Sequence, residues 1–108
     1  MDEKGALTEA VYYILLALIS PLHGYGIMQR VKGMSHGRVI LGAGTLYGAI
    51  NSLLAKGLIA PSPSDDTRRK EYALTPLGLA ALKGEIERLA ELYQNGVAVL
   101  GGNQNEDA

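Results

Sequence analysis

The sequence predicts a single mainly α-helical domain with a minor β component, and three observations support this prediction. Four segments carry apolar residues at the spacing of three and four positions that is typical of amphipathic helices. Two short apolar segments flank a stretch rich in Pro, Ser and Asp, which is the pattern of a β hairpin. The length of 108 residues suits one domain with its own core and is too short for two. The expected order is three helices, the hairpin and a long final helix.

The first helix is predicted from Thr8 to Ile19, with Thr8 as its N-cap. Apolar side chains cover one face, and the opposite face is apolar as well because it includes Tyr12 and Tyr13. A helix that is apolar on all sides must be covered on all sides. In so short a chain we expect a second copy of the protein to supply part of that cover. Pro21 follows the end of this helix.

A short second helix is expected next and should stop at Gly33, followed by a loop over residues 34–42. The third helix is predicted from Ala43 to Lys56, and Gly57 has the position and the residue type of a C′ glycine. Its inner face is apolar and its outer face is small and polar. The predicted outward side chains are Thr45, Gly48, Asn51, Ser52 and Ala55, with Tyr47 on the flank.

The hairpin is predicted from strands at 58–60 and 69–74, joined by a loop over 61–67. Thr75 and Pro76 then supply the N-cap and N1 residues of the last helix. Along this helix a narrow apolar seam repeats at three and four positions, as in helices that pair with a partner helix. The seam consists of Leu82, Ile86, Leu89, Tyr93, Val97 and Leu100. The charged residues lie off the seam and are expected to pair three or four positions apart: Lys83, Glu85, Glu87, Arg88 and Glu91.

Composition excludes several classes of function. The chain has no Cys and two His, so disulfide frameworks, thiolate metal sites and a convincing histidine metal site are not expected. No apolar run reaches the ~18 residues of a membrane span, and we expect an intracellular, cytoplasmic protein. No nucleophile–base pair, carboxylate dyad or phosphate-binding loop stands out, so neither an enzyme nor a cofactor-binding protein is expected.

The net charge of −1 conceals a basic middle segment. Residues 28–70 contain seven Lys and Arg against two Asp, and both flanking segments are net acidic. A local positive field favours binding of phosphate even when the whole chain is close to neutral.

Three helices followed by a hairpin with a basic tip are typical of a winged helix-turn-helix. The small polar outer face of the third helix suits a major groove ~12 Å wide. There Asn51 can pair with adenine, and Thr45 and Ser52 can reach a base or a phosphate. Exposure alone adds Lys56 to the predicted DNA-binding residues. At the hairpin tip three cations can neutralise backbone phosphates: Arg68, Arg69 and Lys70.

Several dispersed motifs carry a resemblance to a known family. The opening, Leu7-Thr8-Glu9-Ala10 and Tyr13-Ile14-Leu15 with His23-Gly24-Tyr25-Gly26-Ile27, resembles that of the PadR family of bacterial transcriptional regulators. Gly44-Thr45-Leu46-Tyr47, with Leu53 and Lys56-Gly57-Leu58-Ile59, resembles its recognition helix. Arg68-Arg69-Lys70 with Tyr72, Leu74-Thr75 and Gly78 resembles its wing and the start of its last helix. The single final helix is similar to that of the smaller members.

The resemblance implies a homodimeric repressor whose last helix crosses onto the partner. It implies a DNA-binding domain over residues 1–75 and a dimerisation helix over 76–100. The small and polar composition of residues 101–108 predicts a disordered tail. It places DNA contacts on Tyr25, Gln29, Thr45, Tyr47, Asn51, Arg68, Arg69 and Lys70.

The resemblance leaves open the role of five side chains of the first and last helices. Some short members hold flat aromatic compounds at the dimer seam, so these side chains either bind a small hydrophobic or aromatic effector or only fill the seam. The residues concerned are Tyr12, Tyr13, Ile86, Leu89 and Tyr93. The alternative function is a winged helix that binds another protein in place of DNA.

Overall fold

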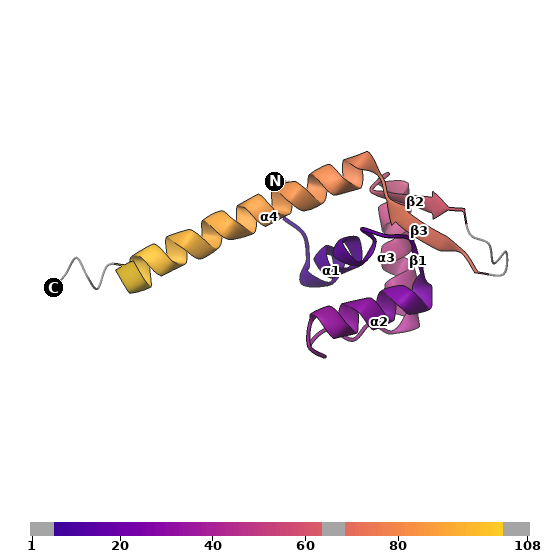
Figure 1. Cartoon of the computed structure of the whole chain (residues 1–108), viewed down its shortest axis with the longest axis horizontal. Helices are drawn as coiled ribbons and strands as arrows, with labels where there is room; N and C mark the ends of the chain where they lie inside the picture. The colour runs from indigo at the N-terminus through magenta and orange to yellow at the C-terminus, as the bar shows by residue number, and fades with distance from the viewer. Residues whose placement is uncertain (1–5, 64–68, 103–108) are drawn as a thin grey trace.

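The computed structural model describes residues 6–63 and 69–102 and confirms the mainly α-helical winged-helix fold (Figure 1). The three strands form one antiparallel sheet in the order β1-β3-β2. The elements in chain order are α1 (Glu9–Ala17), β1 (Leu22–His23), α2 (Gly24–Met34), α3 (Ala43–Ala55), β2 (Ile59–Ser62), β3 (Glu71–Leu74), α4 (Pro76–Val97) and a π-helical segment, Ala98–Gly102, that continues α4.

The predicted helix caps are confirmed. The Thr8 hydroxyl accepts a hydrogen bond from the Val11 amide at 3.2 Å, and the Thr75 hydroxyl accepts one from the Gly78 amide at 3.0 Å. Gly57 follows α3 with a φ of 75°, a left-handed conformation that glycine adopts without a steric penalty. Local chemistry therefore sets the start of α1, the end of α3 and the start of α4.

Several predicted boundaries are wrong. Helix α1 ends at Ala17 and not at Ile19, and β3 begins at Glu71 and not at residue 69. Gly33 does not stop α2, which continues to Met34 and ends where His36 and Gly37 adopt positive φ angles of 54° and 81°. Strand β2 runs through Pro61 and Ser62, which we expected in the loop. Proline is tolerated there because β2 is an edge strand, where a missing amide donor breaks no bond to a further strand.

Strand β1 was not expected from the sequence, which predicted only the two strands of the hairpin. Its two residues pair with β3 in the register Leu22 with Tyr72 and His23 with Glu71. A strand of two residues shows no alternation that a sequence pattern could reveal. This pairing attaches the start of α2 directly to the wing, which is the hairpin of β2 and β3.

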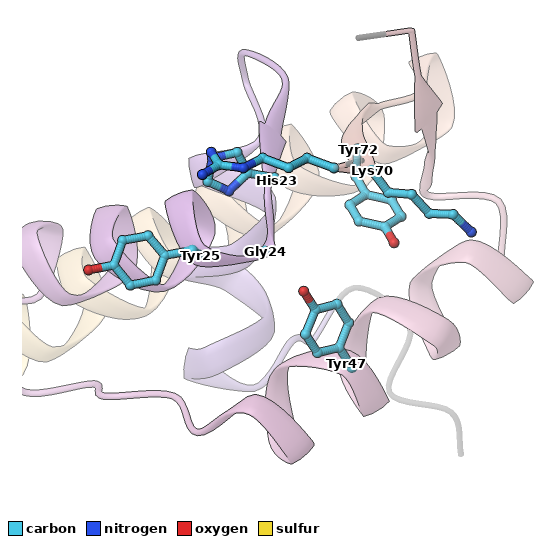
Figure 2. Close-up of a pocket in the computed structure, with 7 residues that line it drawn as sticks. His23, Gly24, Tyr25, Tyr47, Lys70 and Tyr72 are labelled. Carbon is cyan, nitrogen blue, oxygen red and sulfur yellow. The ribbon is translucent and has the colours of Figure 1, made fainter. Parts of the chain in front are cut away.

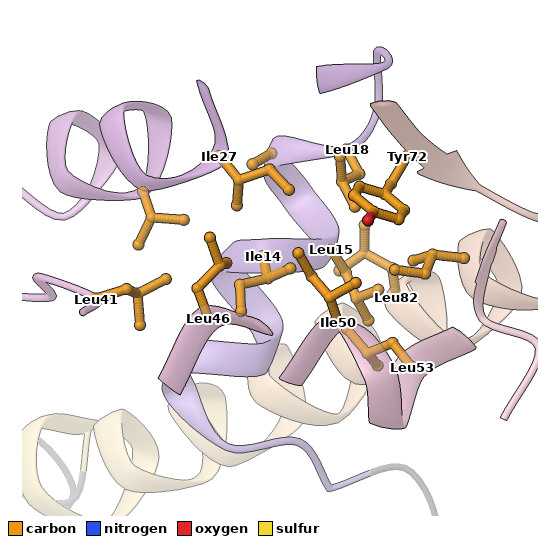
Figure 3. Packing of buried hydrophobic residues seen from close by; sticks show 13 residues of the cluster. Ile14, Leu15, Leu18, Ile27, Leu41, Leu46, Ile50, Leu53, Tyr72 and Leu82 are labelled. Atoms are coloured by element: carbon orange, nitrogen blue, oxygen red, sulfur yellow. The ribbon is translucent and has the colours of Figure 1, made fainter. Parts of the chain in front are cut away.

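The core lies where α1, α2 and α3 meet the wing and the first turns of α4 (Figure 3). Helix α1 is central: its side chains lie between those of α2 and those of α3, and it also contacts α4. The buried apolar residues are Ile14, Leu15, Ala17, Leu18, Ile27, Val31, Leu41, Leu46, Ile50, Leu53, Ile59, Tyr72 and Leu82.

Helix α4 projects far beyond this core (Figure 1). The molecule measures 64 × 29 × 23 Å, and its radius of gyration of 16.9 Å exceeds the ~13 Å of a compact domain of this size. Leu82 is buried in the chain's own core, so it does not belong to an exposed seam. The exposed large apolar residues from here to the end of the helix are Ile86, Leu89, Leu92, Tyr93, Val97, Val99 and Leu100.

Glu85 lies in the core-facing side of α4, although the sequence pattern placed it with the charged residues off the seam. It is 1% exposed and is held by Arg88, whose Nε and Nη2 donate to its two oxygens at 2.8 and 2.6 Å. It also accepts a hydrogen bond from the Leu7 amide at 3.3 Å. The i, i+3 ion pair was predicted, but the burial of its carboxylate was not. The Arg88 guanidinium holds the pKa of Glu85 below its usual range.

Replacing Glu85 by Gln should lower the free energy of unfolding at neutral pH by about 2 kcal/mol, because the ion pair with Arg88 is lost and the amide nitrogen of Gln cannot accept a hydrogen bond. Since the folded pKa is depressed, the carboxylate stabilises the fold above its unfolded pKa and loses this contribution as the pH falls. In urea denaturation, the free energies of unfolding of the wild type and of Glu85→Gln should therefore differ at pH 7 and converge below pH 4.5. The exposed neighbour substitution Glu87→Gln should stay close to wild type at both pH values, and a constant gap for Glu85→Gln would contradict the prediction.

Candidate nucleic-acid interface

The outer face of α3 is exposed as the sequence predicted. The side chains named for this face all lie at the surface, and Tyr47 on the flank is 45% exposed. The opposite face is anchored in the core by Leu46, Ile50 and Leu53. A helix held on one side and free on the other can enter a groove of DNA with its small polar residues in front. The exposed face comprises Thr45, Gly48, Asn51, Ser52 and Ala55.

A cleft of about 420 Å³ lies beside this face, between the start of α2, the start of α3 and strand β3 (Figure 2). Figure 2 shows the hydroxyl groups of Tyr47 and Tyr72 facing the same space, while Tyr25 and Lys70 extend away from its centre in opposite directions. Four predicted DNA-binding residues meet here with three that the prediction did not include. The lining is His23, Gly24, Tyr25, Tyr47, Arg69, Lys70 and Tyr72.

Gly24 makes the close approach of α2 and α3 at this cleft possible. A Cβ atom at Gly24 would lie 2.2 Å from the Tyr47 hydroxyl oxygen and 2.8 Å from its Cζ atom. Any other residue at this position would therefore push the Tyr47 ring away. The absence of a side chain at Gly24 thus allows Tyr47 of α3 to pack against the N-terminus of α2.

His23 is the functional candidate that the sequence analysis did not identify. Its Nδ1 accepts a hydrogen bond from the Gly26 amide at 3.2 Å, so the side chain caps α2. Its Nε2 lies 2.7 Å from Nη1 of Arg69, next to the wing. The available signal was its place immediately before a Gly-rich helix start, where a side-chain acceptor satisfies a free amide.

Other predicted DNA-binding residues do not line this cleft. Gln29 is exposed on α2, and Lys56 is exposed at the end of α3, where it forms the C-cap. Arg68 lies outside the described residues. Among the cations of the basic segment, Arg38 pairs with Glu9, and this contact raises the pKa of Arg38. Its charge is therefore partly compensated within the protein.

A second cavity of about 270 Å³ lies between the start of α1 and the middle of α4. Tyr12 and Tyr13 contact each other edge to face, with ring centroids 5.9 Å apart. Of the five residues predicted to bind an effector or to fill the dimer seam, Tyr12, Tyr13 and Leu89 line the cavity. Ile86 and Tyr93 are exposed along α4 and do not line it. The lining is Leu7, Glu9, Tyr12, Tyr13, Glu85, Arg88 and Leu89.

Residues 6–63 and 69–102 contain neither a membrane-spanning helix nor a cluster of metal ligands. None of the helices in these ranges is both long and apolar enough to cross a membrane. No group of three or more His, Asp or Glu side chains in the same ranges is arranged to hold a metal ion.

Comparison with known proteins identifies relatives of this fold. Residues 14–84 match the model of the transcriptional regulator PadR-like family. The chain is 39% identical over 85 residues to an uncharacterised 37.1 kDa protein in transposon TN4556 of Streptomyces fradiae. That match covers 78% of this chain and 24% of the relative, so the chain spans about a quarter of the relative's length.

Two solved structures are similar along most of their length. A transcriptional regulator from Clostridium thermocellum superposes with a TM-score of 0.71 at 24% identity, over 89% of this chain and 99% of that one. A PadR-like transcription factor from Bacteroides fragilis superposes with a TM-score of 0.66 at 25% identity, over 83% of this chain and 87% of that one. The fold is therefore that of known transcriptional regulators.

Proposed function

Because the chain belongs to the PadR-like family of transcriptional regulators, which are not enzymes, we propose that it is a homodimeric repressor that binds double-stranded DNA. Two copies related by a two-fold axis bind a near-palindromic operator, with half-sites one helical turn, ~34–36 Å, apart. Residues 1–75 form the DNA-binding domain and 76–100 the dimerisation helix in this proposal.

The observation that carries the DNA-binding proposal is the convergence of three elements on one surface. The exposed polar face of α3 adjoins a cleft where α2 contributes Tyr25, α3 contributes Tyr47 and the wing contributes Arg69 and Lys70. Tyrosine hydroxyls and cations are donors to phosphate oxygens, and such contacts fix the orientation of a protein on the duplex. Asn51, one turn further along α3 than Tyr47, has a side chain that can pair with an adenine edge.

The dimer proposal rests on the projecting part of α4. An apolar stripe of this length is not a stable surface for a protein in water, and a second α4 in antiparallel orientation covers it. Tyr93 and Val97 lie in that stripe and are 72% and 48% exposed in the single chain. The same pairing covers the half-buried outer side of α1, including Tyr12 and Leu16.

We propose the cavity between α1 and α4 as the site of a small hydrophobic or aromatic effector. Its volume of about 270 Å³ is close to the lower end of ligand pockets, and the rings of Tyr12 and Tyr13 offer an aromatic wall. Because Leu89 contributes to both this cavity and the exposed stripe, a bound ligand acts on the dimer geometry. The proposed effector site is tested by adding aromatic compounds to the protein–DNA complex and measuring the release of DNA.

Binding of the purified protein to the DNA upstream of its own coding region tests the proposed function. Fluorescence anisotropy at several salt concentrations, with unrelated DNA as the control, should give tight, salt-sensitive binding that favours the upstream fragment. Equal weak binding to both fragments would place the operator elsewhere. No binding to either at low salt would contradict DNA binding and favour a winged helix that binds protein.

Two substitutions should separate sequence readout from phosphate contact. Asn51→Ala should weaken binding to the operator by about 1–3 kcal/mol and leave binding to unrelated DNA unchanged, because a base contact is lost. Lys70→Ala should weaken binding to both and reduce the slope of log affinity against log salt by about 1. Ser62→Ala, on the neighbouring strand, is the control without a charge change. A slope unaffected by Lys70→Ala would remove that residue from the interface.

A further inference from the structure

We propose that His23 is a positioning residue, which holds the Arg69 side chain over the N-terminus of α2 for contact with a backbone phosphate. This inference rests on the proposed DNA-binding function and adds to it a role for His23, which belongs to one of the sequence motifs but was not among the predicted DNA-binding residues. It follows from three features of the cleft: the pairing of β1 with β3, the cap of α2 and the contact between the imidazole and the guanidinium.

Strand β1 fixes the imidazole relative to the wing. His23 pairs with Glu71 in the sheet, and Arg69 precedes Glu71 by two residues in the same wing segment. The backbone of His23 therefore cannot shift along the wing without breaking the β1–β3 register. The ring is half-buried, whereas Arg69 is exposed, so the histidine is the fixed member of the pair.

The ring contacts two donors through its two nitrogens. Nδ1 lies 3.2 Å from the Gly26 amide, and Nε2 lies 2.7 Å from Nη1 of Arg69. A neutral imidazole has one accepting nitrogen at a time. The tautomer that accepts from Arg69 at Nε2 carries its proton on Nδ1, so positioning the arginine and capping α2 are alternative states of the same ring. His23 therefore connects the start of α2 to the wing through its choice of tautomer.

The surrounding charges make this place suitable for a phosphate. The amide groups at the start of α2 add a partial positive charge, and Tyr47 and Tyr72 present hydroxyl groups to the same cleft. Lys70 also lines the cleft, with its side chain extending away from the centre. Glu71 is the acidic group on the adjacent strand, in register with His23. An arginine is a long, rotatable side chain, and ordering it before DNA arrives removes part of the entropy cost of binding.

Two variants of His23 separate capping from positioning. His23→Asn retains a side-chain acceptor for the Gly26 amide, because Asn is among the best N-cap residues, but it has no second ring nitrogen for Arg69. His23→Ala loses both contacts. We expect His23→Asn to unfold at the wild-type temperature and to bind DNA about fivefold more weakly. His23→Ala should in addition lose stability. His36→Asn is the matched control, since Asn tolerates the positive φ of 54° at that loop position.

A double-mutant cycle with Arg69→Ala tests the contact itself. In the Arg69→Ala background, His23→Asn should change DNA affinity by less than about twofold, because the partner that it positions is absent. A DNA-independent readout is the heteronuclear NOE of the Arg69 Nε–H group in the free protein. His23→Asn should lower this NOE toward the value of Arg30, which is exposed on α2.

The outcomes distinguish this inference from the function on which it rests. A wild-type protein that binds no DNA would overturn the proposed function and this role of His23 with it. Wild-type binding with an unchanged His23→Asn affinity, an unchanged Arg69 NOE, or an additive cycle would overturn only the positioning role. A fivefold loss that vanishes in the Arg69→Ala background supports it.

Discussion

Replacing Gly78 by Ala should lower the free energy of unfolding by about 3 kcal/mol, at the upper end of the usual cost of overpacking. A Cβ atom at Gly78 would lie 1.9 Å from the carbonyl oxygen of Leu58 and 3.1 Å from Cδ2 of Leu74. The oxygen cannot move aside freely, since it accepts a hydrogen bond from the Thr75 amide at 3.1 Å. The start of α4 would have to shift away from the strand that follows α3. Thermal unfolding should show a melting temperature about 12–20 °C lower.

Gly84 supplies the matched control on the same helix. Apart from its chain neighbours and the backbone of its own helix, no described atom lies within 4 Å of the position that its Cβ would take. Gly84→Ala should therefore leave the fold unchanged and stabilise it by up to about 1 kcal/mol, which is the helix-propensity difference between the two residues. If both variants melted at the same temperature, the contact between α4 and Leu58 would have to be looser than the distances indicate.

Tyr93→Glu should weaken the proposed dimer by about 100-fold, or about 3 kcal/mol. Tyr93 is 72% exposed in the single chain and lies far from the buried core, so the substitution affects the interface and leaves the winged helix folded. At a two-fold seam it removes two aromatic side chains and introduces two like charges. Sedimentation equilibrium should give the monomer mass at concentrations where the wild type is dimeric, while the backbone amides of the winged-helix core remain as protected from hydrogen exchange as in the wild type.

Asn95→Asp is the charge-matched control, because residue 95 lies on the opposite side of α4 from Tyr93 and is exposed. It should remain dimeric. Operator affinity should fall for Tyr93→Glu and stay at the wild-type value for Asn95→Asp. A monomer binds one half-site alone and loses the high effective concentration that a linked second DNA-binding domain provides. A monomeric wild type, or a dimeric Tyr93→Glu protein, would contradict the proposed seam.

The sequence was sufficient wherever local chemistry decides the structure. Thr8 and Thr75 cap helices because a hydroxyl oxygen satisfies amides within three residues, and Gly57 ends α3 because of its own backbone freedom. The exposed polar face of α3 follows from helical periodicity. For the same reason the order of elements and the exposed residues of the candidate interface were predictable.

The remaining features depend on contacts between distant segments. Strand β1 exists because β3 pairs with it, and nothing in Leu22 and His23 alone indicates a strand. Glu85 is buried because the chain before α1 lies over it and supplies the Leu7 amide, across 78 residues of sequence. The contact of His23 with Arg69 likewise spans 46 positions. Periodicity assigns a residue to a face of its helix, but it does not state what lies opposite that face.

If the proposed dimer is the DNA-binding species, the projecting half of α4 also links gene control to protein abundance. Beyond Glu85 the helix receives little support from its own chain, and isolated helices of this length are marginal in water. In the proposed dimer, order in this segment and association therefore arise together. While monomers predominate, mass action makes the concentration of DNA-competent dimer grow with the square of expression. A twofold change in synthesis then produces up to about a fourfold change in the species that occupies the operator, which is a threshold response without any ligand.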